Sequence, residues 1–330
     1  MSGNMSIIMM DAFGAKFQFD KEAIAETRTL LEPYLRLTPV LSSGFDPQVF
    51  FKAENLQVTG SFKVRTAFSQ ILRLPAEEAR RGIVTSSSGN FALATAYAAS
   101  RLGLSTKIVM MKSSNPVKMA RTKRYGGEVV LCEDRFEARA DTVNEIVRTE
   151  GRTEIAPYDH PFAVLGSTTI AAEILEQCPA VENLVSPVSG GGMVSGIAAA
   201  AKLLKPSIRV WGVQPKGSNA TYLSFQARDY RSIDQARTVA DGLMVTRPGT
   251  VTFPLILEYV DDVVTVCEAA ILQAVCHLHE EERLVVEPSG AVPLAAVIEG
   301  KIPRKNTVLV LSGGNIAPDV LRQALGGSST

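Results

Sequence analysis

The chain has 330 residues, of which 46% are hydrophobic and 21% charged, and its 34 Lys and Arg balance its 34 Asp and Glu. This composition excludes collagen-like, low-complexity and largely disordered chains. Because no long basic run breaks the balanced charge, nucleic acids and anionic membranes are not expected as partners. The length admits two domains or one large α/β unit. We therefore expect a globular protein whose ligand is small.

The amino-terminal residues predict neither a signal peptide nor an anchor. A short apolar run at residues 6–10 has no basic segment before it and no small-residue cleavage site after it. The chain contains no run of about eighteen apolar residues, the length that a membrane helix needs. Four cysteines form no C-x-x-C pair, which argues against a disulfide framework or a zinc ribbon. A cytoplasmic enzyme with buried thiols is the expectation.

One unit recurs along the chain: a short run of β-branched residues, a turn of small residues and then a helix-prone stretch. This order is typical of β-α crossovers around a parallel sheet. The three clearest cases have strands at 82–85, 183–188 and 307–311, turns at 86–90, 189–193 and 312–315, and helices at 91–99, after Gly196 and at 319–325.

Two further strands are predicted between the first two of these turns, at residues 107–111 and 128–131, each flanked by helical patterns. Residues 86–159 are therefore expected to form a smaller α/β domain. It would be inserted in a larger domain made of residues 1–85 and 160–330. Pro157 and Pro161 bracket the predicted return crossing.

The turn at residues 189–193 is a candidate anion site. A strand that ends in a glycine-rich turn and opens a helix directs free backbone N–H groups to one point, where the helix dipole adds positive charge. The dinucleotide pattern G-x-G-x-x-G fails by one position, because Ser195 stands where the last glycine belongs. Gln214, not an acidic residue, follows the next apolar run, and no G-K-[ST] occurs. A monophosphate fits better than a nucleotide, and the alternative is a tight turn with packing glycines.

The turn at residues 86–90 has three hydroxyl groups and an amide at the start of another predicted helix. Such a turn suits a carboxylate ligand, but the same residues also occur in a helix that is simply well capped. The sequence leaves both interpretations open.

Residues 51–67, FKAENLQVTGSFKVRTA, resemble the lysine segment of the fold-type II pyridoxal-phosphate enzymes, in the branch of serine/threonine dehydratases and serine racemase. Five further motifs of that branch follow in the family's order, at residues 87–90, 187–193, 240–242, 286–290 and 311–315. Together the motifs span about residues 30 to 320. The resemblance implies pyridoxal 5'-phosphate as cofactor. It also implies the tryptophan synthase β-like fold, an α/β fold with two open, twisted, mostly parallel sheets flanked by helices and a small domain inserted in a large one.

The resemblance also assigns roles to individual residues. It implies that Lys63 is catalytic and bonds the cofactor aldehyde, an attack that needs an amine whose pKa burial has lowered. Ser88 is the second catalytic candidate, because in racemases this position offers a proton on the face opposite the lysine. The other cofactor contacts are assigned to Phe62, which packs on the ring, to Asn90, to the phosphate loop Gly190, Gly191, Gly192 and Met193, and to Ser312 at the pyridine nitrogen; the substrate carboxylate is assigned to Ser87, Ser88, Gly89 and Asn90.

Some positions depart from the family pattern. Lys63 is followed by Val-Arg instead of Asp-Arg, which favours the dehydratase and racemase branch over the cysteine and threonine synthases. Phe91 replaces a common histidine, Tyr158 replaces an asparagine near the cofactor hydroxyl, and residues 165–169 replace Gly-Gln-Gly-Thr. These changes lie on the substrate side and leave the substrate open. At the family's cation site, Gln214 and Ala220 offer no charged oxygen ligand, so no tight metal site is predicted.

The first functional hypothesis is a lyase that removes water from a β-hydroxy amino acid such as L-threonine or L-serine, and releases a 2-keto acid and ammonia. A hydroxyl partner such as Ser312 implies a largely neutral cofactor ring, a weaker electron sink that favours β-elimination over transamination. The alternatives are a serine-type racemase, a lyase for 3-hydroxyaspartate, phenylserine or diaminopropionate, and a binding protein that has kept the fold. The family suggests a homodimer.

Overall fold

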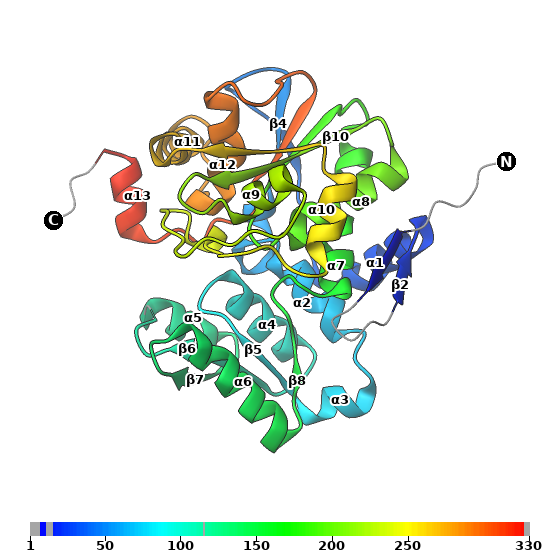
Figure 1. Ribbon diagram of the computed structural model, residues 1–330, viewed down its shortest axis with the longest axis vertical. Coiled ribbons are helices and arrows are strands. Elements are labelled where there is room, and N and C mark those ends of the chain that lie inside the picture. Colours follow the sequence, from blue (N-terminus) through cyan, green and yellow to red (C-terminus); the bar gives the residue numbers. More distant parts are fainter. Residues whose placement is uncertain (1–6, 11–15, 115, 327–330) are drawn as a thin grey trace.

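The computed structural model describes residues 7–10, 16–114 and 116–326. Its two main sheets lie in two parts of the molecule, the larger above and the smaller below in Figure 1. A third sheet is an antiparallel pair of β1 (Ile7–Met10) and β2 (Lys16–Phe19). Among the described residues, no helix is both long and apolar enough to cross a membrane.

The larger sheet has six strands in the order β11-β10-β9-β12-β4-β3. Every neighbouring pair is parallel except β3 and β4, which run antiparallel at one edge. The strands are β3 (Val40–Ser42), β4 (Val49–Lys52), β9 (Asn183–Pro187), β10 (Arg209–Pro215), β11 (Asp262–Val266) and β12 (Thr307–Val310).

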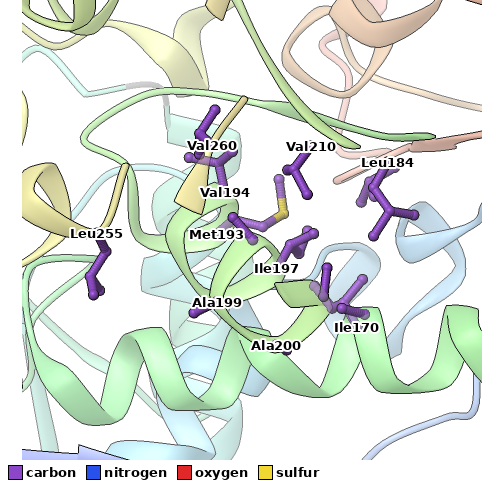
Figure 2. Close-up of a cluster of buried hydrophobic side chains, with 14 of the residues drawn as sticks. Ile170, Leu184, Met193, Val194, Ile197, Ala199, Ala200, Val210, Leu255 and Val260 are labelled. Carbon is purple, nitrogen blue, oxygen red and sulfur yellow. The ribbon is translucent and has the colours of Figure 1, made fainter. Parts of the chain in front are cut away.

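Helices cover both faces of this sheet because alternate strand residues point to opposite faces. Leu184 and Val210 face the cluster formed with α7 (Pro161–Gln177), α8 (Gly192–Leu204) and α10 (Thr252–Tyr259). Figure 2 shows Met193, Val194 and Ile197 of α8 in this cluster. The neighbouring residues Val185 and Trp211 face the cluster formed with α11 (Glu268–Glu280) and α12 (Pro288–Ile298). The remaining helices of this part are α1 (Lys21–Leu31), α2 (Lys63–Ile71), α9 (Ala220–Ala227) and α13 (Pro318–Ala324), with 3-10 turns at Glu32–Tyr34, Glu54–Leu56, Val58–Gly60 and Asp241–Leu243.

The smaller sheet has four parallel strands in the order β7-β6-β5-β8. One face packs on α6, through Val84, Val109 and Val143, and the other packs on α4 and α5. Its elements are β5 (Ile83–Ser86), β6 (Thr106–Met111), β7 (Glu128–Cys132), β8 (Thr153–Glu154), α3 (Ala76–Arg81), α4 (Asn90–Arg101), α5 (Pro116–Arg124) and α6 (Phe136–Glu150).

The two sheets and their flanking helices confirm the predicted fold class. The five predicted strands lie within one residue of their expected ends, but α8 begins at Gly192 and not after Gly196. The helix starts earlier because Gly191 has a φ of 103° and caps it directly. The proposed boundary between residues 85 and 86 falls inside β5, so the small sheet itself starts at Ile83. The division into two domains stays a prediction.

A buried cluster of four charged residues holds α2 in place. The Arg65 guanidinium donates to both oxygens of Glu54, at 2.8 and 2.9 Å, and to both oxygens of Glu173, at 2.5 and 2.8 Å. Lys52 Nζ donates to Glu173 at 2.6 Å and to the Thr38 carbonyl at 2.7 Å. Burial opposes these charges, but the two carboxylates outweigh it and raise the pKa of Arg65. The cluster thus ties α2 to β4, to the turn at Glu54–Leu56 and to α7.

Replacing Arg65 with Met is expected to destabilise the protein strongly. The substitution leaves Glu54 and Glu173 buried with only Lys52 for charge compensation, and breaking a buried pair in this way costs about 3–5 kcal/mol. Urea unfolding of the two proteins would measure the loss. Arg28→Met is the matched control, because the Arg28–Glu176 pair has side chains 33% and 59% exposed and should contribute less than about 1 kcal/mol. Equal losses in the two variants would contradict the role of the cluster.

Candidate active site

Lys63 begins α2 at the junction of the two parts of the molecule. Helix α2 packs on α7 of the larger part and on α4 of the smaller part. The Phe62 N–H donates to the Ser312 carbonyl at 3.0 Å, which fixes the start of the helix beside the segment that follows β12. The segment before the lysine also pairs with that region through a bridge between Ser61 and Gly313. Lys63 therefore lies at a helix start that is fixed by contacts with α7, with α4 and with the segment after β12.

The environment of the Lys63 amine favours its unprotonated form. Nζ donates to the Pro157 carbonyl at 2.7 Å and lies 5.0 Å from the ring centroid of Phe62 and 5.7 Å from that of Phe91. Burial lowers the pKa of Lys63 to about 8. An amine is reactive only when unprotonated, so this shift makes a useful fraction available at physiological pH.

The loop at residues 189–192 leads from β9 into α8, and the first N–H groups of that helix have no partner within the helix. Gly191 needs its positive φ of 103°, and a side chain there would meet Ile256 and Thr252. The Gly190 carbonyl accepts from Thr252 Oγ1 at 2.5 Å and from the Gly249 N–H at 3.1 Å. Residues at and just before the start of α10 thus hold the loop in place, and the N–H groups of the loop are suited to bind an anion.

Tyr158 lies against the glycine loop and is a neighbour of Lys63 through Pro157. A Cβ on Gly190 would come within 2.1 Å of the Tyr158 ring, and one on Gly192 within 2.8 Å of Tyr158 Cβ. These two glycines are therefore required for the tyrosine to pack there. Burial, followed by the charge of Asp159, raises the pKa of the Tyr158 hydroxyl, so it stays protonated at neutral pH.

Three side chains from distant segments form a hydrogen-bonded network beside Gly313. Asn90 Nδ2 donates to Glu287 Oε1 at 2.6 Å, and Asn315 Nδ2 donates to Asn90 Oδ1 at 2.9 Å. Burial and the nearby Asp241 raise the pKa of Glu287 to about 7. The Glu287 carboxyl is thus partly protonated near neutral pH. The network fixes Asn90 at the start of α4 relative to the segment after β12.

The other predicted substrate residues lie in the turn between β5 and α4. Ser87 Oγ accepts from the Gly89 N–H at 3.2 Å, which closes the turn, and Ser88 and Gly89 stand directly before the helix start at Asn90. A carboxylate placed here would meet the N-terminal N–H groups of α4 and the hydroxyl groups of the turn. Their role in substrate binding is a proposal.

The structure places the predicted cofactor residues on four segments: around Lys63, in the glycine loop, at the start of α4 with Asn90, and after β12. Met193 differs from the others, since its side chain packs in the core beside Val194 and Ile197 (Figure 2). Any contact of Met193 with a phosphate would use its backbone N–H. Ser312 is 5% exposed and lies two residues after the end of β12, next to Phe62 through its carbonyl.

Several neighbours of Lys63 had no signal in the sequence. The Pro157 carbonyl accepts from Lys63, and the Gln70 amide binds the adjacent Ala156. Asp159 accepts from three backbone N–H groups around Val251. These contacts join segments that are far apart in the sequence, so only the fold shows them. Glu287 and Asn315 lie within the motifs that carry the family resemblance, but their link to Asn90 has no signal in the sequence either. An alignment of relatives could have identified the motif residues, whereas the backbone contacts carry no residue signature.

Two further features lie outside this site. A cavity of about 500 Å³ includes Asn315 in its lining, but Lys63 and the glycine loop take no part in it; its other lining residues include Arg36, Thr59, Arg121, Arg124 and Tyr125. At the position of the family's cation site, the buried Gln214 accepts the Tyr222 N–H at 2.7 Å through its amide oxygen. Within the part of the chain that the structure describes, no cluster of His, Cys, Asp or Glu could hold a metal ion.

The residues present fit a phosphorylated aldehyde cofactor. A monophosphate matches the unpartnered N–H groups at the start of α8, and the loop that holds them has no Lys or Arg. An aldehyde matches the Lys63 amine, whose pKa burial has lowered. The Ser312 hydroxyl offers a neutral partner for a ring nitrogen.

Comparison with known proteins indicates the same kind of cofactor, and the matches cover nearly the whole chain. Residues 25–313 match the family model described as pyridoxal-phosphate dependent enzyme. The chain is 38% identical to a serine racemase of Arabidopsis thaliana over 93% of this chain and 96% of that protein. It is 40% identical to a catabolic L-threonine dehydratase of Escherichia coli over 82% of this chain and 83% of that protein. The solved structure of maize serine racemase aligns with a TM-score of 0.88 at 34% identity and covers 92% of this chain and 96% of that one.

The rate at which the cofactor-free protein takes up pyridoxal phosphate covalently should rise with pH, with a midpoint near pH 8, and level off above about pH 9. Only the unprotonated amine attacks the aldehyde, and the pKa of Lys63 is about 8, compared with 10.5 for an exposed lysine. The visible absorbance of the bound cofactor would follow the reaction. Lys63→Ala is the control, and its exposed lysines should show no such plateau. A wild-type midpoint near pH 10 would contradict the assignment.

Proposed function

The chain belongs to the family of pyridoxal-phosphate dependent enzymes, and we propose that it catalyses the β-elimination of a β-hydroxy amino acid such as L-threonine or L-serine. Pyridoxal 5'-phosphate is the cofactor, and when bound it supplies an electron sink for the charge that develops at the substrate α-carbon. The products would be a 2-keto acid and ammonia. This would make the protein a carbon–oxygen or carbon–nitrogen lyase.

The observation that carries the proposal is the Lys63 amine, held at 2.7 Å from the Pro157 carbonyl with a pKa of about 8. An amine with this pKa can take the α-proton of an amino acid at neutral pH. The electron pair left by that C–H bond then forms the Cα–Cβ double bond while the C–O bond breaks. The hydroxide leaves as water after gaining a proton. Addition of one water to the resulting enamine, after its tautomerisation, releases the 2-keto acid and ammonia.

The other residues of the site would bind and orient the substrate. The turn at residues 87–90 would hold the carboxylate at the start of α4, and the network of Asn90, Glu287 and Asn315 keeps that helix start in place. The Ser312 hydroxyl, in place of a carboxylate, supports elimination over transamination, because a neutral partner favours a neutral ring and so a weaker electron sink. The threonine dehydratases among the relatives support the same class of reaction.

Incubation of the pyridoxal phosphate-loaded protein with an amino-acid panel tests this proposal. The panel holds L- and D-serine, L- and D-threonine, 3-hydroxyaspartate, phenylserine and diaminopropionate, and the readout is 2-keto acid release. We expect release from at least one β-hydroxy amino acid, and at least about 10²-fold less from Lys63→Ala, because general-base catalysis contributes about 10²–10⁴-fold. Absence of release across the panel, with the cofactor bound, would contradict the lyase assignment.

Amino-acid racemisation is the second candidate, and Ser88 is the observation that favours it. Racemisation needs acid/base groups on both faces of the α-carbon, and Ser88 lies within the predicted carboxylate turn, on a different segment from Lys63. The serine racemases among the relatives support this candidate as well. The homodimer implied by the family and the cytoplasmic location expected from the sequence stay predictions.

Ser88→Ala is expected to separate the two reactions. If Ser88 gives the second proton, the variant should lose racemisation by about 10²-fold or more, since general acid–base catalysis contributes 10²–10⁴-fold. Elimination, which needs only Lys63 as the base, should stay within about ten-fold of the wild type. Chiral chromatography of serine and 2-keto acid release would be measured on the same samples. An equal loss of both activities would show that Ser88 has no separate acid/base role.

A further inference from the structure

The chain segment that returns from the small sheet to α7 contacts the Lys63 side chain. Its first part belongs to the small sheet, since the Ile155 N–H donates to the Val84 carbonyl at 2.9 Å. Its last part belongs to the large part, where Asp159 Oδ1 accepts from the Val251 N–H at 2.8 Å and Oδ2 from the Thr250 N–H at 2.8 Å. Between these points lie Ala156 and Pro157, and the Pro157 carbonyl is the acceptor for Lys63.

Gln70 clamps this segment from the same helix that carries the lysine. Its Nε2 donates to the Ala156 carbonyl at 2.9 Å, and its Oε1 accepts from the Ala156 N–H at 3.0 Å. Gln70 is 3% exposed, and seven residues, or about two helical turns, separate it from Lys63. The two side chains therefore leave the same face of α2 and reach adjacent residues of one segment.

The local stiffness of the chain transmits the clamp to the Pro157 carbonyl. A residue before proline is confined to extended backbone conformations, and the proline ring fixes its own φ near −65°. When both backbone polar groups of Ala156 are fixed, the Pro157 carbonyl can change its direction mainly by rotation about the ψ torsion of Pro157. The result is the acceptor observed 2.7 Å from Lys63 Nζ.

We propose that Gln70 is a positioning residue, which holds the Pro157 carbonyl as the resting acceptor of the Lys63 amine whenever that amine is not bonded to the cofactor. One N–H of the amine is then fixed, so its lone pair has a restricted range of directions. The restraint reduces the motion that the amine must lose before it attacks an aldehyde or takes a proton. The catalytic consequence rests on the proposed function, whereas the clamp and its effect on cofactor attachment do not.

The test uses two variants of Gln70 and one matched control. Gln70→Met keeps the length of the side chain and removes both bonds to Ala156, and Gln70→Glu keeps an acceptor for the Ala156 N–H but removes the donor. Gln177→Met is the control, because Gln177 also donates its amide to a backbone carbonyl, that of Thr38 at 3.1 Å, away from Lys63. All three are compared with the wild type as full-length, cofactor-free protein and after loading with pyridoxal phosphate.

The first two readouts do not depend on the substrate. Hydrogen–deuterium exchange of residues 153–160 should be faster by roughly ten-fold in Gln70→Met and by less in Gln70→Glu, because the Ala156 N–H loses its partner only in the former. Covalent attachment of pyridoxal phosphate at pH 8 should be slower by roughly ten-fold in Gln70→Met. The control should match the wild type in both.

The third readout is turnover of the substrate that the panel identifies. In Gln70→Met, kcat should fall by roughly ten-fold with KM changed less than about two-fold, and the isotope effect of α-deuterated substrate should grow, because proton transfer to Lys63 becomes slower. A residue that only supports folding would lower the melting temperature and leave these kinetic quantities unchanged.

Three results would overturn the inference. Unchanged exchange at residues 153–160 in Gln70→Met would show that the clamp does not restrain the segment. Faster exchange with wild-type attachment and kcat would show that the clamp has no effect on Lys63. If Gln70→Met does not fold, wild-type attachment in Gln70→Glu with faster exchange would have the same meaning. Failure of the wild type to release 2-keto acid would instead contradict the proposed function alone, since exchange and attachment would still report on Gln70.

Discussion

The double salt bridge of Arg65 is the constraint on which the site depends. Its guanidinium binds Glu54 and Glu173, both almost completely buried, and so fixes the rotation of α2 against the turn at Glu54–Leu56 and against α7. A bidentate guanidinium restrains direction as well as distance, which a point charge such as lysine does not. Lys63 lies two residues before Arg65 and Gln70 five residues after it, so their directions follow from the same restraint. The charged cluster therefore acts less as a source of net stability than as a device that orients the helix.

The site forms where the carboxyl ends of strands from both sheets meet. The glycine loop follows β9, Ser312 closely follows β12, and the turn at residues 87–90 follows β5 of the smaller sheet. Ligands in open α/β sheets bind beyond the carboxyl ends of the strands, where loops and helix starts converge. Helix α2 joins the two parts, because it packs on α7 on one side and on α4 on the other (Figure 1). A substrate at this junction would contact residues from both sheets.

The sequence predicts those features that depend on neighbours in the chain. Short runs of β-branched residues identified the strands near residues 183 and 307, and glycine turns identified the loops after them. The resemblance predicted pyridoxal phosphate, which the family match confirms, and it predicted Lys63 as the residue that bonds this cofactor, which stays a prediction. Contacts across long separations could not be read this way: Asn90 and Glu287 are 197 residues apart, and Gln70 and Ala156 are 86 apart. A backbone carbonyl such as that of Pro157 leaves no trace in residue type, and its role follows only from the fold.

Similarity to both dehydratases and racemases is the result that the chemistry of this site would produce. Both reactions begin with removal of the α-proton, and the role proposed for the Lys63 amine would serve both. They differ in the second step, which is either departure of the β-hydroxyl group or return of a proton to the opposite face. The residues that would decide between them are few, with Ser88 foremost, whereas those that build the fold and bind the cofactor are many. Under the proposed function, overall identity to either group would therefore reflect the shared step, and the choice of reaction would rest on the residues on the side of the substrate opposite Lys63.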